Sequence, residues 1–221
     1  MVIAERKPLS EILAGVSPYQ NILVLGCGGC MTVGLSGGLR EVGLMAQEII
    51  LATAGRDIKI SQAIVQRQCE PLFIEKLAES MGSVEAVLSL GCGVGVQALA
   101  DRYPNVVILP ALNTRFLGMN VSQGVWVERC QACGECLLGE TGGICPVVRC
   151  PKSLLNGPCG GSQNGMCEVG EGIPCAWAVI YERLEKRGEL ERLLVVREPK
   201  NWGKAYGPGV VVKGGLRGET Q

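Results

Sequence analysis

The sequence contains no histidine. This absence excludes zinc sites with imidazole ligands, Rieske clusters, and nucleophiles activated in Ser-His or Cys-His pairs. It also excludes acid–base catalysis by an imidazole. Any metal bound by this protein must therefore be held mainly by thiolates.

Aromatic residues are scarce and neither sign of charge is in excess. Phe, Trp and Tyr make up 4% of the chain, too little for a base-stacking surface or a ring-lined peptide groove. The 21 basic and 21 acidic residues give a formal net charge of zero. Nucleic acids and anionic membranes favour proteins with a basic face. We therefore expect neither as a partner.

Long hydrophobic runs are also lacking. The most apolar run, residues 86–100, contains three glycines, and a membrane span needs about 20 predominantly apolar residues. The N-terminal stretch MVIAERKPLSEIL carries four charged residues and has no apolar core of the kind found in signal peptides. We therefore expect a cytoplasmic protein without a membrane span. In that compartment clustered cysteines bind metals more often than they form disulfides.

The first half of the chain alternates short apolar runs with amphipathic stretches. The apolar runs predict strands at 21–26, 58–65, 85–91 and 105–111. The amphipathic stretches predict helices at 38–55, 70–82 and 94–103. This alternation is typical of a parallel sheet with right-handed crossovers. We predict a small α/β domain, Rossmann-like or flavodoxin-like, over residues 1–122, with its strands in the order second, first, third, fourth.

The second half differs in composition. Glycine, proline and cysteine crowd together until residue 175, and a helical pattern with a break at Gly188 follows over 176–196. We predict a cysteine-rich iron–sulfur domain with a C-terminal helix over 123–200, and a glycine-rich tail over 201–221. The segment before the helix has too few apolar residues to build its own core, so it needs cross-links such as bound metals or disulfides.

Eight cysteines can provide these cross-links: Cys130, Cys133, Cys136, Cys145, Cys150, Cys159, Cys167 and Cys175. The first three have the C-x2-C-x2-C spacing of bacterial ferredoxins, and eight thiolates match two [4Fe–4S] clusters. The spacing leaves five candidates for the fourth ligand of the first cluster. One cluster with one zinc ion, and zinc or disulfides alone, stay open. A four-thiolate zinc site usually has two separate C-x2-C pairs, and none follows the opening run.

Four further cysteines, Cys27, Cys30, Cys69 and Cys92, follow the first three predicted strands. These strands are neighbours in the predicted order, so the thiols should converge at the carboxyl edge of the sheet, where open α/β sheets bind ligands. They are candidates for a third site that holds either a [4Fe–4S] cluster or an all-thiolate zinc ion. The alternative is that they are small buried hydrophobic residues.

The long cysteine motif, from RCQACGEC to GMCEV, and the stretch CAWAVIYERL resemble the methylenetetrahydrofolate reductase C-terminal domain family. With NILVLGCGGC, RQCEP and VLSLGCGVGVQ, the sequence is similar over residues 5–200 to the MetV-type small subunits of acetogen-like reductases. The resemblance implies a non-catalytic iron–sulfur subunit that passes electrons to the flavin of a TIM-barrel partner. That partner reduces methylene-tetrahydrofolate to methyl-tetrahydrofolate in the reductive acetyl-CoA pathway. All twelve cysteines carry over as metal ligands.

The resemblance leaves the electron donor open between ferredoxin and another redox module, and we predict no catalytic residue in this chain. Two other functions stay open. The glycine-rich stretch VLSLGCGVGVQALA invites comparison with an adenosylmethionine- or corrinoid-dependent methyltransferase. In that loop an acidic residue normally precedes the glycines, and here Ser89 and Leu90 occupy its place. The third possibility is a zinc scaffold subunit.

Overall fold

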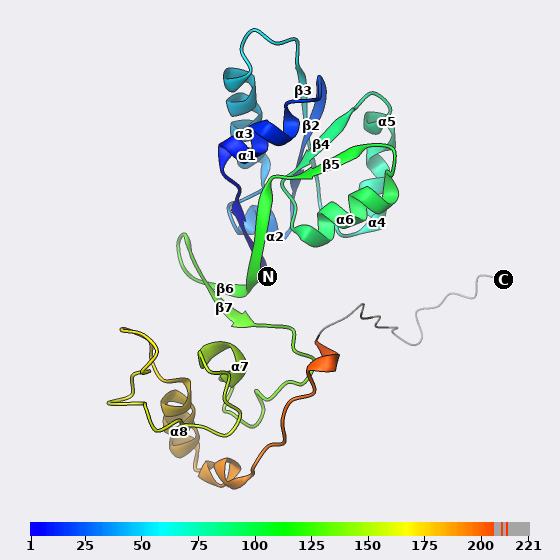
Figure 1. The fold of residues 1–221 in the computed structure, drawn as a ribbon. Helices are drawn as coiled ribbons and strands as arrows, with labels where there is room; N and C mark the ends of the chain where they lie inside the picture. Colours follow the sequence, from blue (N-terminus) through cyan, green and yellow to red (C-terminus); the bar gives the residue numbers. More distant parts are fainter. Residues whose placement is uncertain (206–208, 210, 212–221) are drawn as a thin grey trace, which may run out of the picture. The chain divides into compact units, whose positions relative to one another are not determined.

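The computed structural model describes residues 1–205, 209 and 211. The chain divides into two compact units, Met1–Glu128 and a second that begins at Arg129 (Figure 1). Most of the tail predicted over 201–221 lies outside the described residues. Within the described part of the chain, no helix is both long and apolar enough to cross a membrane.

The first unit contains a four-stranded parallel sheet. Its strands are β2 (Asn21–Cys27), β3 (Lys59–Val65), β4 (Ala86–Ser89) and β5 (Val107–Pro110), in the order β3-β2-β4-β5. The register places Cys27 opposite Val65 and Leu25 opposite Ser89. The predicted α/β class and strand order are therefore confirmed.

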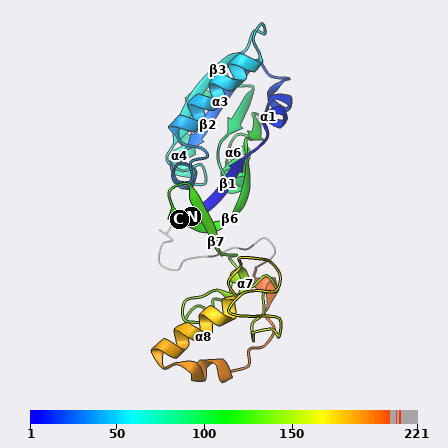
Figure 2. The same ribbon diagram turned by 90° about the vertical axis from the view of Figure 1, so that its left-hand side faces the viewer.

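Helices cover both faces of this sheet (Figures 1 and 2). They are α1 (Leu9–Val16), α3 (Leu39–Ala52), α4 (Pro71–Ile74), α5 (Ala78–Met81) and α6 (Gly93–Arg102). Successive side chains of a strand point to opposite faces. Ile22 and Val24 of β2 accordingly pack with α1 and α3, whereas Leu23 and Leu25 pack with α4, α5 and α6.

The helix predicted over 70–82 is interrupted. A 3-10 turn, η1 (Glu75–Leu77), separates α4 from α5. Ile74, Leu77 and Met81 are nevertheless all buried against the sheet. Their spacing of three and four residues is the spacing of one helical face, so the apolar pattern survives the change of helix type.

A second, three-stranded sheet completes the first unit and was not predicted from the sequence. Its strands are β1 (Val2–Arg6), β6 (Leu112–Ser122) and β7 (Val125–Cys130), in the order β1-β6-β7, with β1 antiparallel to β6. Most of β6 is exposed. It therefore lacks the strong apolar pattern by which strands are recognised in a sequence.

The second unit has few regular elements. They are α7 (Pro146–Arg149), α8 (Ala176–Arg187) and the 3-10 helices η2 (Leu190–Leu194) and η3 (Trp202–Lys204). Helix α8 ends at Gly188, which has a φ of 69°, so the predicted helix break is confirmed. The buried side chains form one small cluster: Ile144, Cys150, Cys175, Ala176, Trp177, Ile180 and Leu184. Two of its seven members are cysteines.

Candidate metal centres

The structure brings together the four predicted cysteines of the first unit. Cys27 ends β2, Cys30 opens α2 (Cys30–Val33), Cys92 precedes α6, and Cys69 lies in the loop after β3. Burial raises the pKa of the Cys69 thiol, and the nearby thiols of Cys92, Cys27 and Cys30 raise that pKa further. The Cys69 thiol therefore lies within electrostatic reach of the other three thiols, at the carboxyl edge of the parallel sheet.

Gln68 fastens the loop that carries Cys69. Its side chain is 1% exposed and donates Nε2 to the carbonyl oxygens of Leu25 and Gly26, each at 3.0 Å. Its Oε1 accepts a hydrogen bond from the Ser89 hydroxyl at 2.6 Å. One side chain thus links the ends of β2 and β4 beside Cys69. Sequence reasoning missed Gln68, although it stands next to Cys69 in the stretch RQCEP.

Four cysteines of the second unit line one cavity of about 290 Å³: Cys130, Cys133, Cys136 and Cys145. We call this cavity the cysteine cradle. The chain turns sharply between the first three cysteines, where Ala132 and Gly134 have φ values of 53° and 76°. The backbone N–H of Ala132 donates to the Sγ atom of Cys130 at 3.3 Å. Of the five candidates for the fourth position, the structure places Cys145 in the cradle.

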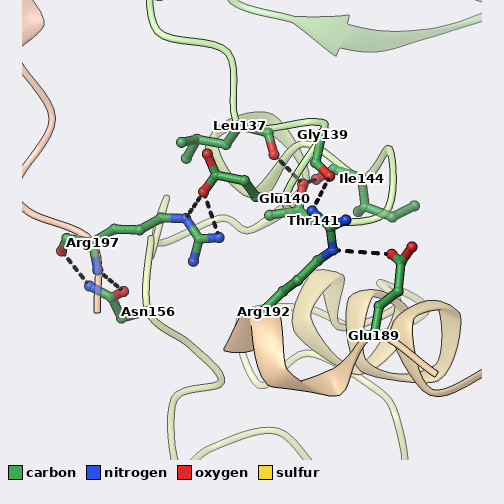
Figure 3. A network of polar contacts seen from close by, with 9 residues as sticks. All are labelled: Leu137, Gly139, Glu140, Thr141, Ile144, Asn156, Glu189, Arg192 and Arg197. Carbon is green, nitrogen blue, oxygen red and sulfur yellow. Dashed lines mark hydrogen bonds and ion pairs between the residues drawn. The ribbon is translucent and has the colours of Figure 1, made fainter. Parts of the chain in front are cut away.

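A closed loop returns the chain from Cys136 to Cys145. The Thr141 side chain is fully buried, and its hydroxyl lies 3.0 Å from the carbonyl oxygen of Leu137 and 2.6 Å from that of Ile144 (Figure 3). The loop therefore begins and ends beside the same hydroxyl. This contact places Cys145, the residue after Ile144, near the C-x2-C-x2-C run. Thr141 was not predicted from the sequence.

Residues from the C-terminal side hold this loop from outside. Arg192 donates Nη1 to the carbonyl oxygen of Gly139 at 3.3 Å, and Arg197 forms an ion pair with Glu140 at 2.8 Å (Figure 3). The backbone of Arg197 also exchanges two hydrogen bonds, each 2.8 Å long, with the side chain of Asn156. These contacts connect segments about 40 to 60 residues apart in the sequence.

Two lysines bind Glu135, which lies between the cradle cysteines Cys133 and Cys136. Lys200, whose side chain is 2% exposed, donates Nζ to the carbonyl oxygen of Glu135 at 2.7 Å. Lys204 forms an ion pair with the Glu135 carboxylate. This hydrogen-bonded ion pair, with the nearby charges of both lysines, lowers the pKa of Glu135.

The other four cysteines of the second unit lie on connected segments. Cys150 and Cys175 share the buried apolar cluster. A hairpin joins Cys167 to Cys175: the Cys167 N–H donates to Ile173 O and the Cys175 N–H to Gly165 O, both at 2.8 Å. The Cys159 thiol lies 3.6 Å from the carboxylate of Glu168, the residue after Cys167.

Two of these sulfur atoms have hydrogen-bond donors beside them. Burial by itself raises the pKa of Cys175, but hydrogen bonds from the Ser162 hydroxyl and the backbone N–H groups of Ala178 and Trp177 lower that pKa below its ordinary value. Lys152 places Nζ 3.7 Å from the Cys159 Sγ atom and pairs with Glu168. Donors of this kind favour the thiolate, which is the form that binds metals.

None of these three groups of cysteines converges on a single point in the described part of the chain. Among the residues that the structure describes, no three His, Cys, Asp or Glu side chains are placed to hold one metal ion. A tetrahedral zinc ion needs each of its thiolates about 2.3 Å from one point. A [4Fe–4S] cluster spreads its four thiolates around a larger body. The cysteine cradle has four cysteines along a cavity of about 290 Å³, rather than around one point.

Comparison with known families identifies the segment that contains the cradle. Residues 109–203 match a family described as methylene-tetrahydrofolate reductase C terminal. This segment is similar to that family. No curated protein and no solved structure matches the chain.

The matched segment includes all eight cysteines from Cys130 to Cys175 and none of the other four. It also includes the residues that close the cradle loop, Thr141, Lys200 and Arg197. The resemblance predicted from the cysteine motif is therefore confirmed over this segment. The parallel sheet, apart from the end of β5, lies outside the match.

Proposed function

We propose that this chain is the iron–sulfur electron-transfer subunit of a methylenetetrahydrofolate reductase complex. The family match over residues 109–203 supports the reductase context. The observation that carries the proposal is the cysteine cradle, in which Cys130, Cys133, Cys136 and Cys145 line one cavity. When bound, [4Fe–4S] clusters supply one-electron transfer. The chain itself has no imidazole for proton transfer, which supports a non-catalytic role.

The geometry of the cradle favours a cluster over a zinc ion. Four thiols surround a cavity of about 290 Å³, whereas zinc thiolates crowd around one point. The Ala132 N–H that donates to Cys130 Sγ supplies a hydrogen bond of the kind that orients a thiolate ligand and adjusts its basicity. We therefore assign Cys145 as the fourth ligand of the first cluster.

The remaining four cysteines, Cys150, Cys159, Cys167 and Cys175, are proposed to hold the second [4Fe–4S] cluster. The lowered pKa of Cys175 and the Lys152 ammonium beside Cys159 support thiolates at both positions. The third site, at Cys27, Cys30, Cys69 and Cys92, is proposed to bind either a [4Fe–4S] cluster or a zinc ion. The other three thiols act on the Cys69 thiol, and thiolates are ligands for both.

The proposed partner is a TIM-barrel subunit that carries a flavin. Its reaction converts one methylene-tetrahydrofolate into one methyl-tetrahydrofolate and consumes two electrons and two protons. The electrons are supplied singly by ferredoxin or another one-electron redox module, and the protons come from solvent. We place the complex in the cytoplasm, in the reductive acetyl-CoA pathway.

The first test is the iron, acid-labile sulfide and zinc content of the chain purified without oxygen. The proposal expects about eight iron atoms with matching sulfide, for two clusters. About twelve iron atoms, or about eight with one zinc ion, would identify the content of the third site. Zinc without iron would contradict the proposal and favour the scaffold.

The second test addresses electron transfer. The cluster-loaded chain is reduced with dithionite, freed of excess reductant and mixed without oxygen with the oxidised flavin subunit. We expect the visible absorbance of the flavin to bleach, and the chain alone to leave methylene-tetrahydrofolate unchanged. Folate reduction by the chain alone contradicts a non-catalytic role. Saturable binding of adenosylmethionine would favour the methyltransferase alternative.

A further inference from the structure

Lys152 and Glu168 form an ion pair beside the sulfur atom of Cys159. The Lys152 Nζ atom lies 3.7 Å from the Cys159 Sγ atom, and the Glu168 Oε1 atom lies 3.6 Å from it. One positive and one negative charge thus stand at almost equal distances from a sulfur atom that the proposed function assigns to the second cluster. At equal distances the effects of the two charges on that sulfur atom nearly cancel.

Both charged residues belong to the segments that carry other ligands proposed for this cluster. Lys152 follows Cys150 by two residues, and Glu168 directly follows Cys167. The Glu168 carboxylate also lies against the backbone of Gly161, where a Cβ atom would collide with it. The hydrogen bond between the two charged side chains raises the pKa of Lys152 and lowers the pKa of Glu168, so both are charged at neutral pH.

Metal binding changes the group that the ion pair meets at Cys159. In the metal-free chain the thiol has a proton that it donates to the Glu168 carboxylate at 3.6 Å. A cysteine that binds iron has lost this proton, so its sulfur atom and the carboxylate are then two negative groups side by side. Lys152 has N–H donors for both of them. Charges and hydrogen bonds at the sulfur atoms of a cluster set its reduction potential.

We propose that Lys152 and Glu168 set the reduction potential of the second [4Fe–4S] cluster in opposite directions, through the sulfur atom of Cys159. The inference rests on the proposed function, since it needs Cys159 as a cluster ligand. Reduction adds one negative charge to a cluster, so a nearby cation stabilises the reduced form and a nearby anion destabilises it. Lys152 therefore raises the reduction potential, and Glu168 lowers it by a similar amount.

The test compares five forms of the full chain, loaded with iron and sulfide without oxygen. They are the wild type, Lys152→Gln, Glu168→Gln, the double variant with both changes, and Lys186→Gln. The last removes a positive charge from the exposed end of α8. Iron and sulfide are counted on each sample. The midpoint potential of each cluster is then measured by a redox titration followed by electron paramagnetic resonance, at low salt because salt screens exposed charges.

Lys152→Gln should make one cluster harder to reduce, by about tenfold in the equilibrium constant, which is about 59 mV for one electron. Glu168→Gln should make the same cluster easier to reduce by a similar amount. The double variant and Lys186→Gln should stay near the wild-type potential. The cluster that shifts should be the one that Cys145→Ser retains, since Cys145 belongs to the cradle. If one single variant loses its iron, the other carries the test by itself.

The outcomes that overturn the inference are distinguishable from failure of the proposed function. Intact clusters with unchanged potentials, or shifts in the same direction in both single variants, refute the roles of Lys152 and Glu168 and leave the proposed function standing. A shift of the cradle cluster instead refutes the action through Cys159. An equal shift in Lys186→Gln would reduce the effect to net charge and also refute a local role. A wild-type chain that binds no iron in the second unit refutes the proposed function, and the inference with it.

Discussion

The two units position their cysteines by different physical means. In the first unit three neighbouring parallel strands end at one edge, and the thiols of Cys27, Cys69 and Cys92 meet there because the sheet topology brings the strand ends together. In the second unit no sheet connects the cysteines of the cradle. Its loop is closed instead by the buried hydroxyl of Thr141 and by side chains that bind backbone groups. The first arrangement follows from topology and the second from individual polar contacts.

The two units also contain cysteines whose pKa values are shifted in opposite directions. At Cys69, burial and neighbouring thiols raise the pKa, and a backbone hydrogen bond offsets only part of this. At Cys175, burial is outweighed by hydrogen bonds from Ser162, Ala178 and Trp177, and the pKa falls. In this pair the hydrogen-bond donors, rather than exposure, set the direction of the pKa shift. Cys175 is buried, whereas Cys69 is exposed.

The largest effect should come from removing a ligand of the cradle. Cys145→Ser is expected to lose about four iron atoms per chain, because a [4Fe–4S] cluster needs its fourth thiolate. Val148→Ser, a change of similar size within α7, should keep them. Cys92→Ser should leave both cluster signals of the second unit intact, since Cys92 belongs to the other group. Iron analysis and electron paramagnetic resonance check all three. Full iron content in Cys145→Ser would contradict the assignment of Cys145 as the fourth ligand of the first cluster.

A smaller effect is expected when the cradle loop loses its central hydroxyl. Thr141→Val keeps the shape of the side chain but removes the single hydroxyl proton that lies between the carbonyl oxygens of Leu137 and Ile144, which should cost about 1–3 kcal/mol in the free energy of unfolding. The matched control is Thr53→Val in the first unit, where one partly buried hydroxyl donates to Ile49 O at 2.6 Å. There we expect about 0.5–1.5 kcal/mol. Urea titrations of the full chain measure both. Equal losses would show that Thr141 has no special role in closing the loop.

The thiols should also differ in how their reactivity depends on pH. Alkylation proceeds through the thiolate. In metal-free protein with an intact far-ultraviolet circular dichroism spectrum, Cys175 should react with a midpoint below pH 9.0, because its pKa is lowered. Cys69 should react with a midpoint above pH 9.0, because its pKa is raised. Mass spectrometry of samples alkylated across the pH range measures both midpoints.

Two variants sharpen this comparison. Cys92→Ser should lower the midpoint of Cys69, since Cys92 is the neighbouring thiol with the largest effect on it. Ser162→Ala should raise the midpoint of Cys175, since the Ser162 hydroxyl is the first of its stabilising donors. Reversed midpoints in the wild-type protein would contradict the contrast between the two units.

The smallest effect concerns the two lysines at Glu135. The Lys204 side chain is 53% exposed, so Lys204→Gln should scarcely change the urea midpoint, and high salt should abolish any difference. Lys200→Gln should lower the midpoint clearly, because that side chain is 2% exposed and also donates to a backbone carbonyl. The same urea titration, at low and high salt, tests the pair. A larger effect at Lys204 would show that burial does not govern this contact.

The parallel sheet could be predicted because its strands are buried and strongly apolar. Apolar runs that alternate with amphipathic stretches have few other folds available, and cysteines that follow adjacent strands must then meet at one edge. The three strands of the second sheet escaped prediction. The longest of them, β6, is mostly exposed and is held by pairing with β1, which no local pattern records.

The sequence by itself determined the α/β core and the order of its strands, because these follow from the periodicity of apolar residues. It also determined that cysteine, and not histidine, is available as a metal ligand, because this follows from composition. Only the tertiary structure decided that Cys145 lines the cradle and that Gln68 and Thr141 hold the segments that carry the two groups of cysteines. Gln68 reaches backbone groups 42 and 43 residues away in the sequence, and Thr141 binds backbone groups at the two ends of its own loop. Such contacts leave no periodic trace, and they exist only after the chain has folded.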